Sequence, residues 1–290
     1  MKTIRFLLFI VILTSKFTIL NAEVKPTFVQ SFAVTDITGD NIGGPADVTL
    51  SPDGTKIHFT NFTNEAGFAF LRQFTLTTPF DISTIDTSSE VRLNLDGGSD
   101  DVGTFVQGHA FNNDGTKVFV IQQSGKLNIH TLTTPYDISE TSQDADDGVN
   151  YKAAFSAGDG DVRSRDITFN NDGTKMYFID GGNNQIGDGG VVEYDLSTPF
   201  VPSTATFVNE LVVTDKLSRY EQDLEFDDDG TRLFVIDANT TPSSLAKIAV
   251  YKLSTPFHTS TATFVGSIQN LETVRFERTC FPSISGHIGS

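Results

Sequence analysis

The chain has 290 residues, 25 of them Phe and none of them Trp, and a formal net charge of −17. A surface of this charge repels nucleic acid and anionic lipid, so we expect neither as a partner. The single cysteine, Cys280, excludes an internal disulfide. The 24 glycines and many Asp, Thr and Ser residues favour short strands joined by turns over long helices.

Residues 1–22 have the order of a secretory signal peptide. Lys2 and Arg5 precede an apolar run over residues 6–13, and a more polar stretch leads to Ala22. This run is too short to cross a bilayer core of about 30 Å with ease, although an uncleaved anchor is the alternative. We expect export to a secreted, periplasmic or extracellular location, with no membrane-spanning segment later in the chain.

Two short motifs recur together along the rest of the chain. An Asp-Gly-Thr turn followed by Lys or Arg begins at four positions about 60 residues apart, a period typical of repeat architectures. A Thr-Pro-aromatic motif follows each copy. The turns begin at Asp53, Asp114, Asp172 and Asp229, and the second motif ends at Phe80, Tyr136, Phe200 and Phe257.

Each repeat predicts four short strands. Asp-Gly between two apolar runs is a strong hairpin signal, because glycine accepts the positive φ that such a turn needs. Proline cannot donate to a ladder and so marks the end of each third strand. In chain order the predicted strands are 48–50, 57–60, 70–76 and 91–95; 109–111, 118–121, 127–132 and 151–155; 167–169, 176–179, 191–196 and 207–213; and 224–226, 233–236, 248–253 and 264–268.

A four-stranded antiparallel sheet of this kind cannot bury both of its faces alone. Neighbouring sheets must therefore stack face to face, as the blades of a β-propeller do. A β-helix would need shorter repeats, and an immunoglobulin-type array would need repeats of about 100 residues. We predict an all-β fold with β-propeller repeats over residues 23–268 and an irregular tail or incomplete blade over residues 269–290.

The segment Leu50-Ser51-Pro52-Asp53-Gly54-Thr55-Lys56-Ile57 resembles the Ser-Pro-Asp-Gly repeat of the WD40-like propellers related to TolB. The later copies, which continue as Val118-Phe119-Val120 and Met176-Tyr177-Phe178, also resemble the YVTN and lactonase-like propellers. The resemblance covers residues 27–268 and implies the fold. It implies little about function, because such repeats occur in binding proteins, enzymes and surface proteins.

The strand count leaves one outer strand unpaired. Residues 27–30 resemble the outer-strand segments 206–209 and 263–266, whereas residues 269–290 contain neither repeat motif. One interpretation is a truncated copy of a larger propeller, whose open blade face would make the chain associate. The other is a compact ring of four or five blades with an irregular tail.

Three carboxylates are the main candidate site. Asp47, Asp166 and Asp223 share one position at the start of the innermost strand, where Gly108 stands in the second repeat. Converging there at the central channel, they would suit a hard cation such as Ca²⁺. The alternative is that each one caps turn amides or bonds the neighbouring blade.

Two arginines beside Asp166 form a second candidate. Arg163 and Arg165 could bind an anionic ligand near the channel or pair with the aspartate. The turn aspartates are expected to shape their turns through local hydrogen bonds. His109 aligns with apolar residues and is expected to be buried. Asn61 and Asn239 begin glycosylation sequons.

No Ser-His-Asp set, zinc spacing or phosphate-binding loop can be assembled, so we predict no catalytic residue. The composition and repeats therefore favour an exported binding module for a protein, glycan or surface polymer. The alternative is a metal-dependent hydrolase of the lactonase or gluconolactonase type that uses Asp47, Asp166 and Asp223. The chain could also be part of a larger surface protein. Calcium is the one candidate cofactor.

Overall fold

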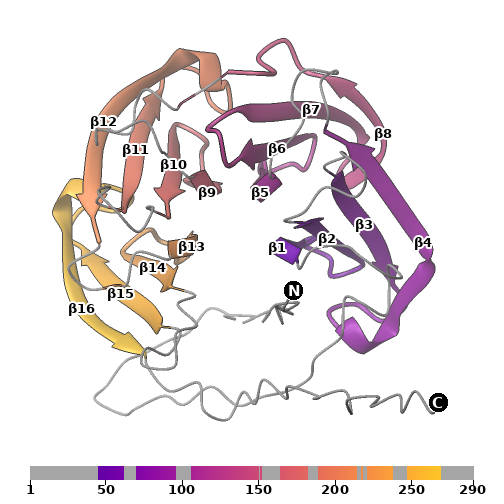
Figure 1. Cartoon of the computed structure of the whole chain (residues 1–290), viewed down its shortest axis with the longest axis horizontal. Helices are drawn as coiled ribbons and strands as arrows, with labels where there is room; N and C mark the ends of the chain where they lie inside the picture. Colours follow the sequence, from indigo (N-terminus) through magenta and orange to yellow (C-terminus); the bar gives the residue numbers. More distant parts are fainter. Residues whose placement is uncertain are drawn as a thin grey trace, which may run out of the picture.

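A computed structural model of the chain describes residues 45–61, 70–95, 106–149, 151, 164–181, 189–213, 217, 221–237 and 247–268. These residues form four separate four-stranded antiparallel sheets arranged around a central axis, a four-bladed β-propeller (Figure 1). The predicted fold class is therefore confirmed. The predicted signal peptide, the strand expected at residues 27–30 and the tail over residues 269–290 lie outside the described residues.

Each blade runs from the axis outward in chain order. Blade 1 contains β1 (Pro45–Leu50), β2 (Lys56–Asn61), β3 (Phe70–Leu76) and β4 (Ile85–Asn94). Blade 2 contains β5 (Val106–Phe111), β6 (Lys117–Gln122), β7 (Leu127–Thr134) and β8 (Asp137–Gln143). Blade 3 contains β9 (Ser164–Phe169), β10 (Lys175–Asp180), β11 (Gly190–Leu196) and β12 (Ala205–Val212). Blade 4 contains β13 (Glu221–Phe226), β14 (Arg232–Asp237), β15 (Lys247–Leu253) and β16 (Ala262–Ile268).

Helical structure in the described part of the chain is limited to three single turns of 3₁₀ helix. These turns are η1 (Ile82–Thr84), η3 (Pro202–Thr204) and η4 (Thr259–Thr261), each leading into an outermost strand. None of the helices in this part of the chain is long and apolar enough to cross a membrane.

The outermost strand of blade 2 differs from the prediction. It was expected at residues 151–155, but β8 occupies Asp137–Gln143. Pro135 and Tyr136 make a two-residue turn, and Thr134 pairs with Asp137 across it. Tyr151 is instead buried between blades 2 and 3, with its ring 5.0 Å from that of Phe178.

The two repeat motifs contact each other in every blade. The N–H of Phe80 donates to the carbonyl oxygen of Gly54 over 2.9 Å, and the other three blades repeat this bond. All four aromatic residues at this place have a positive φ, from 55° to 61°. The turn aspartates shape their turns as predicted, since Asp53 Oδ1 accepts from the N–H of Thr55 over 3.0 Å and its three counterparts do the same.

Three apolar cores lie between successive blades. The largest side chains of the core between blades 2 and 3 are Phe119, Tyr151, Phe178 and Tyr194, all buried. The innermost strands pack side by side in the same order, β1 on β5, β5 on β9 and β9 on β13. Among the described residues no comparable contact joins β13 to β1 (Figure 1). A fourth apolar cluster, Ile57, Phe59, Phe74 and Leu76, draws all its members from blade 1.

Candidate functional site

Each innermost strand has an irregular register near its start. The irregularity falls between Pro45 and Asp47 in β1, and at the matching place in β5, β9 and β13. A β-bulge bends its strand and re-aims the side chains beside it. In this propeller it directs the aspartates of the candidate site toward the neighbouring blade.

Asp47 fastens blade 1 to blade 2. Its Oδ2 accepts from the backbone N–H of His109 over 2.7 Å and lies 2.7 Å from His109 Nδ1. Its Oδ1 accepts from the N–H of Val48 over 2.6 Å. His109 is buried, as predicted. Both oxygens of Asp47 are therefore engaged, which matches the alternative in which the aspartate bonds the neighbouring blade.

Asp166 makes the equivalent contact between blades 3 and 4. Its Oδ2 accepts from the N–H of Leu224 over 3.2 Å, and its carboxyl is hydrogen-bonded to that of Asp223. Burial and then the charge of Asp223 raise the pKa of Asp166 well above its ordinary value. Burial and then the charge of Asp47 raise the pKa of Asp223 to about 6. Because two adjacent carboxylates cannot both ionise cheaply, the ionisation of either group opposes that of the other.

Gly108 is the reason why blade 2 contributes no carboxylate to this set. A Cβ at this position would lie 2.0 Å from Asp166 Oδ1 and 2.5 Å from Asp166 Cα. No side chain fits there while Asp166 keeps its place. The break in the aspartate column was visible in the sequence, but its cause is a contact between two blades.

Arg165 binds across the junction between blades 2 and 3. Its Nη1 donates to Gln107 Oε1 over 3.1 Å. This contact uses part of the guanidinium group that we expected to bind either an anionic ligand or Asp166. Arg163 and Asn239 lie outside the described residues, and Asn61 is the last residue of β2. Anion binding and glycosylation therefore stay predictions.

Glu225 is a charged residue of the site that the sequence interpretation missed. It aligns with Thr49, Ala110 and Thr168, so its charge is unusual for this position. Its exposed side chain borders a pocket of about 340 Å³ whose other lining residues, all from blade 1, are Val48, Thr49, Leu50, Ser51, Pro52 and Phe80. Desolvation by the surrounding protein, and then the charges of Asp223 and Asp47, raise the pKa of the Glu225 carboxyl above its ordinary value.

The site therefore concentrates negative charge without forming a ligand set for a metal. In the part of the chain that the structure describes, no three His, Cys, Asp or Glu side chains are grouped so that they could hold an ion. Both oxygens of Asp47 and Oδ2 of Asp166 accept from backbone N–H groups, and the carboxyls of Asp166 and Asp223 contact each other. Glu225 remains exposed, and its carboxyl interacts electrostatically with those of Asp223 and Asp47.

No protein-family model matches the chain, and no curated protein matches it. Similar solved structures include a Bacteroides uniformis protein assigned to the 6-phosphogluconolactonases, 14% identical over 78% of this chain and 58% of that one, with a TM-score of 0.48. The Pseudomonas aeruginosa periplasmic gluconolactonase PpgL is 15% identical over 79% and 54%, with a TM-score of 0.47.

Chaetomium thermophilum Sqt1, solved with the N-terminus of ribosomal protein L10 bound, is 13% identical over 79% of this chain and 51% of that one, with a TM-score of 0.43. The chain spans little more than half the length of these three proteins. Since lactonases and an interaction module are matched about equally, at low identity and low TM-score, we take no activity or partner from them.

Proposed function

We propose that this propeller is a binding module that recognises a positively charged segment of a protein partner at its acidic channel, and that it is not a metal-dependent hydrolase. One observation carries the proposal. The channel carboxylates that a hydrolase would use are bonded to blade amides and to each other, whereas Glu225 is left exposed beside them.

The crowding of carboxyls supports a cationic partner. Desolvation by the surrounding protein is the first cause of the raised pKa values of Asp223 and Glu225, and neighbouring carboxylates are the second: Asp47 acts on Asp223, and both Asp223 and Asp47 act on Glu225. A cation placed among them would relieve this repulsion and favour the ionised forms. The net charge of −17 adds a long-range attraction for the same kind of partner.

Isothermal titration calorimetry with a hexalysine peptide tests the proposal. We expect binding that weakens as salt is added, because dissolved ions screen the attraction between the peptide and the carboxylates. Glu225→Gln should weaken binding about fivefold or more. Glu140→Gln, which removes an exposed charge on β8, serves as the matched control and should have no effect. No binding, or equal weakening by both variants, would refute the proposed role.

Hydrolysis of gluconolactone is the complementary assay. We expect no rate above the uncatalysed one with Ca²⁺, Mg²⁺ or Zn²⁺ present. A metal-dependent rate that is lost on Asp166→Asn and Asp223→Asn would reinstate the hydrolase alternative.

A further inference from the structure

The three junctions between successive blades each hold a flat ring in the same place. The ring belongs to the second strand of one blade, and it packs against the innermost strand and the Thr-Pro-aromatic turn of the next blade, here called the ring socket. All three rings are 0% exposed. The ring pairs and the distances between their centroids are His58 and Phe111 at 4.7 Å, Phe119 and Phe169 at 4.7 Å, and Tyr177 and Phe226 at 4.6 Å.

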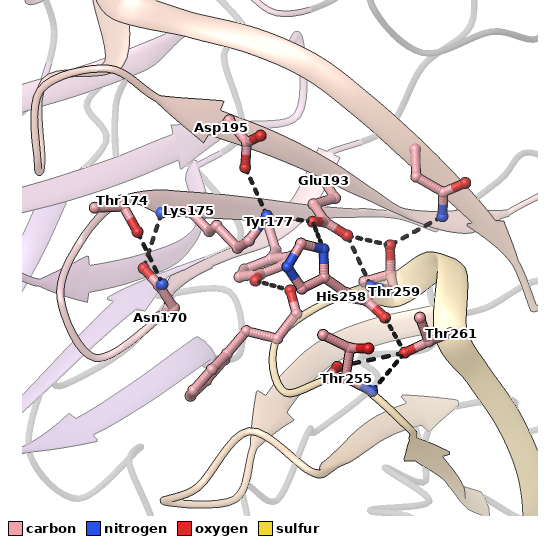
Figure 2. A network of polar contacts seen from close by, with 12 residues as sticks. Asn170, Thr174, Lys175, Tyr177, Glu193, Asp195, Thr255, His258, Thr259 and Thr261 are labelled. Atoms are coloured by element: carbon pink, nitrogen blue, oxygen red, sulfur yellow. Dashed lines mark hydrogen bonds and ion pairs between the residues drawn. The ribbon is translucent and has the colours of Figure 1, made fainter.

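Two of the three rings also make a polar contact with the turn of their ring socket. Tyr177 donates its hydroxyl proton to the carbonyl oxygen of Phe257 over 2.5 Å, beside the polar network of Glu193 (Figure 2). His58 Nε2 lies 3.0 Å from the carbonyl oxygen of Tyr136. In both cases the carbonyl belongs to the aromatic residue of the Thr-Pro-aromatic motif. A ring socket is therefore suited to a ring that carries a hydrogen-bond donor.

Blade 1 has a ring socket that is open. Leu50 and Phe80, which hold the positions of the socket residues in the other blades, line the pocket of about 340 Å³. Phe80 is 44% exposed, whereas its three counterparts are half-buried. Phe234 of blade 4 holds the position of Tyr177 but is not among the residues that line the pocket. Among the described residues, Glu225 alone reaches this pocket from another blade.

Negative charge borders the apolar wall of this pocket. Val48, Leu50 and Phe80 supply apolar side chains, and Glu225 supplies a carboxylate. Asp228, in the turn that follows Glu225, also acts on the ionisation of Glu225. In the other three blades neither of these two positions carries a charge. The open ring socket thus differs from the three filled ones by an acidic border, which is complementary to a cation.

From these observations we infer that the open ring socket binds an extended segment of a partner protein in which an aromatic residue with a donor, tyrosine or tryptophan, lies two positions from a lysine or arginine. The ring packs against Leu50 and Phe80, its donor meets the carbonyl oxygen of Phe80, and the cation pairs with Glu225. Side chains two positions apart in an extended segment point to the same side, so both enter the pocket together. Recognition of this kind rests on the proposed function, because it uses the same carboxylate.

Fluorescence titration of the purified full chain with short peptides tests the inference. The probe is the acetylated and amidated peptide Lys-Gly-Trp-Gly-Lys-Gly, whose indole is the only one in the mixture because the protein has no Trp. We expect its emission to shift to the blue on binding, since the ring leaves water for an apolar pocket. The matched peptide Lys-Gly-Ala-Gly-Lys-Gly should compete about tenfold or more weakly than unlabelled probe.

A charged socket wall gives the matching comparison on the protein. Leu50→Asp places a carboxylate in the wall and should weaken binding of the tryptophan peptide about tenfold or more, while hexalysine binds at least as well as to the wild type. Phe207→Asp adds the same charge on the outer strand β12, where Phe207 is 49% exposed, and should bind both peptides like the wild type. Circular dichroism shows whether both variants are folded.

The outcomes separate this inference from the proposed function. Equal affinities for the tryptophan and alanine peptides, or a blue shift that Leu50→Asp leaves unchanged, would overturn the inference while hexalysine binding still supported the proposed function. Binding of none of these peptides, hexalysine included, would overturn both. The peptide comparison uses the wild-type protein, so it decides the question even if Leu50→Asp does not fold.

Discussion

The backbone N–H of Phe200 donates to the carbonyl oxygen of Gly173 over 3.0 Å, and the ring of Phe200 lies where a side chain on Gly173 would be. This contact joins the two repeat motifs of blade 3, which are separated in sequence by a complete strand pair. The same contact in every blade fixes the aromatic residue of the Thr-Pro-aromatic motif at a positive φ, a conformation that a bulky side chain adopts only when its surroundings hold it there.

Gly173→Ala should therefore destabilise the protein by about 2 kcal/mol or more, because the added Cβ meets both a positive φ and a ring. The φ of Gly173 is 70°, and the Cβ would lie 2.2 Å from Phe200 Cε2. Urea unfolding measures the change. Gly266→Ala is the control, since a Cβ there has nothing within 4 Å, and a comparable loss in both variants would contradict this account.

Glu193→Ala should destabilise the junction between blades 3 and 4 by about 3 kcal/mol, because it leaves Lys175 and the amide of Thr259 without their buried partner. Asp195→Asn removes the other carboxylate bound to Lys175, but this one has a side chain that is 57% exposed. Its loss should amount to less than about 1 kcal/mol. Thermal unfolding of both variants makes the comparison, and similar losses would contradict it.

The carboxyl pair at the channel should make stability fall as the pH rises. A carboxyl whose pKa is raised in the folded state binds its proton more tightly there than in the unfolded chain. The stabilisation from Asp223 is complete below its ordinary pKa of 3.8 and is lost as the pH rises through about 6. Asp223→Asn keeps an acceptor for Asp166 and removes the charge.

Melting temperatures of the wild type and of Asp223→Asn, measured from pH 4 to pH 8, check this prediction. We expect the stability of the variant relative to the wild type to increase as the pH rises from 4 to about 6, and to stay constant above that pH. Asp86→Asn changes a half-buried carboxyl on β4, the outermost strand of blade 1, and should run parallel to the wild type. A difference between the wild type and Asp223→Asn that does not vary with pH would contradict the raised pKa of Asp223.

His58 acts in the opposite direction. Burial lowers its pKa to about 3 from its ordinary value of 6.5, so the folded state resists protonation that the unfolded chain accepts. Its contribution is complete above pH 6.5 and decreases as the pH falls toward 3. His58→Phe installs the residue type that Phe119 provides at the same position of blade 2, and it should reduce the acid sensitivity of the melting temperature in this range. If the melting temperature of the variant decreased with falling pH as steeply as that of the wild type, the acid sensitivity would arise from other groups.

Much of the fold could be predicted from the sequence, because the signals that define a blade are local. The Asp-Gly-Thr turns, the alternation of the strands and the proline stops each depend on a few adjacent residues, and repetition made them plain. The exception was β8, where Pro135 was read as the end of a strand followed by a long connection. Whether a proline opens a tight turn or a longer loop depends on how the following segment pairs.

The sequence predicted which aspartates form the candidate site, but not which groups their carboxylate oxygens bind. The aspartate column indicated that Asp47, Asp166 and Asp223 would converge, and they do influence one another's ionisation. That their oxygens would be taken by His109, Leu224 and a second carboxyl depends on contacts between blades. The role of Gly108 as space for Asp166 has the same origin.

The sequence by itself determined the blades, their number in the described part of the chain and the turn that begins each one, since hydrogen bonds between neighbouring residues fix these features. Only the tertiary structure decided which face of each blade is covered and where Glu225 meets blade 1. Those features arise where residues of different repeats come into contact. The local motifs are the same in every repeat, so they do not specify what packs against each blade.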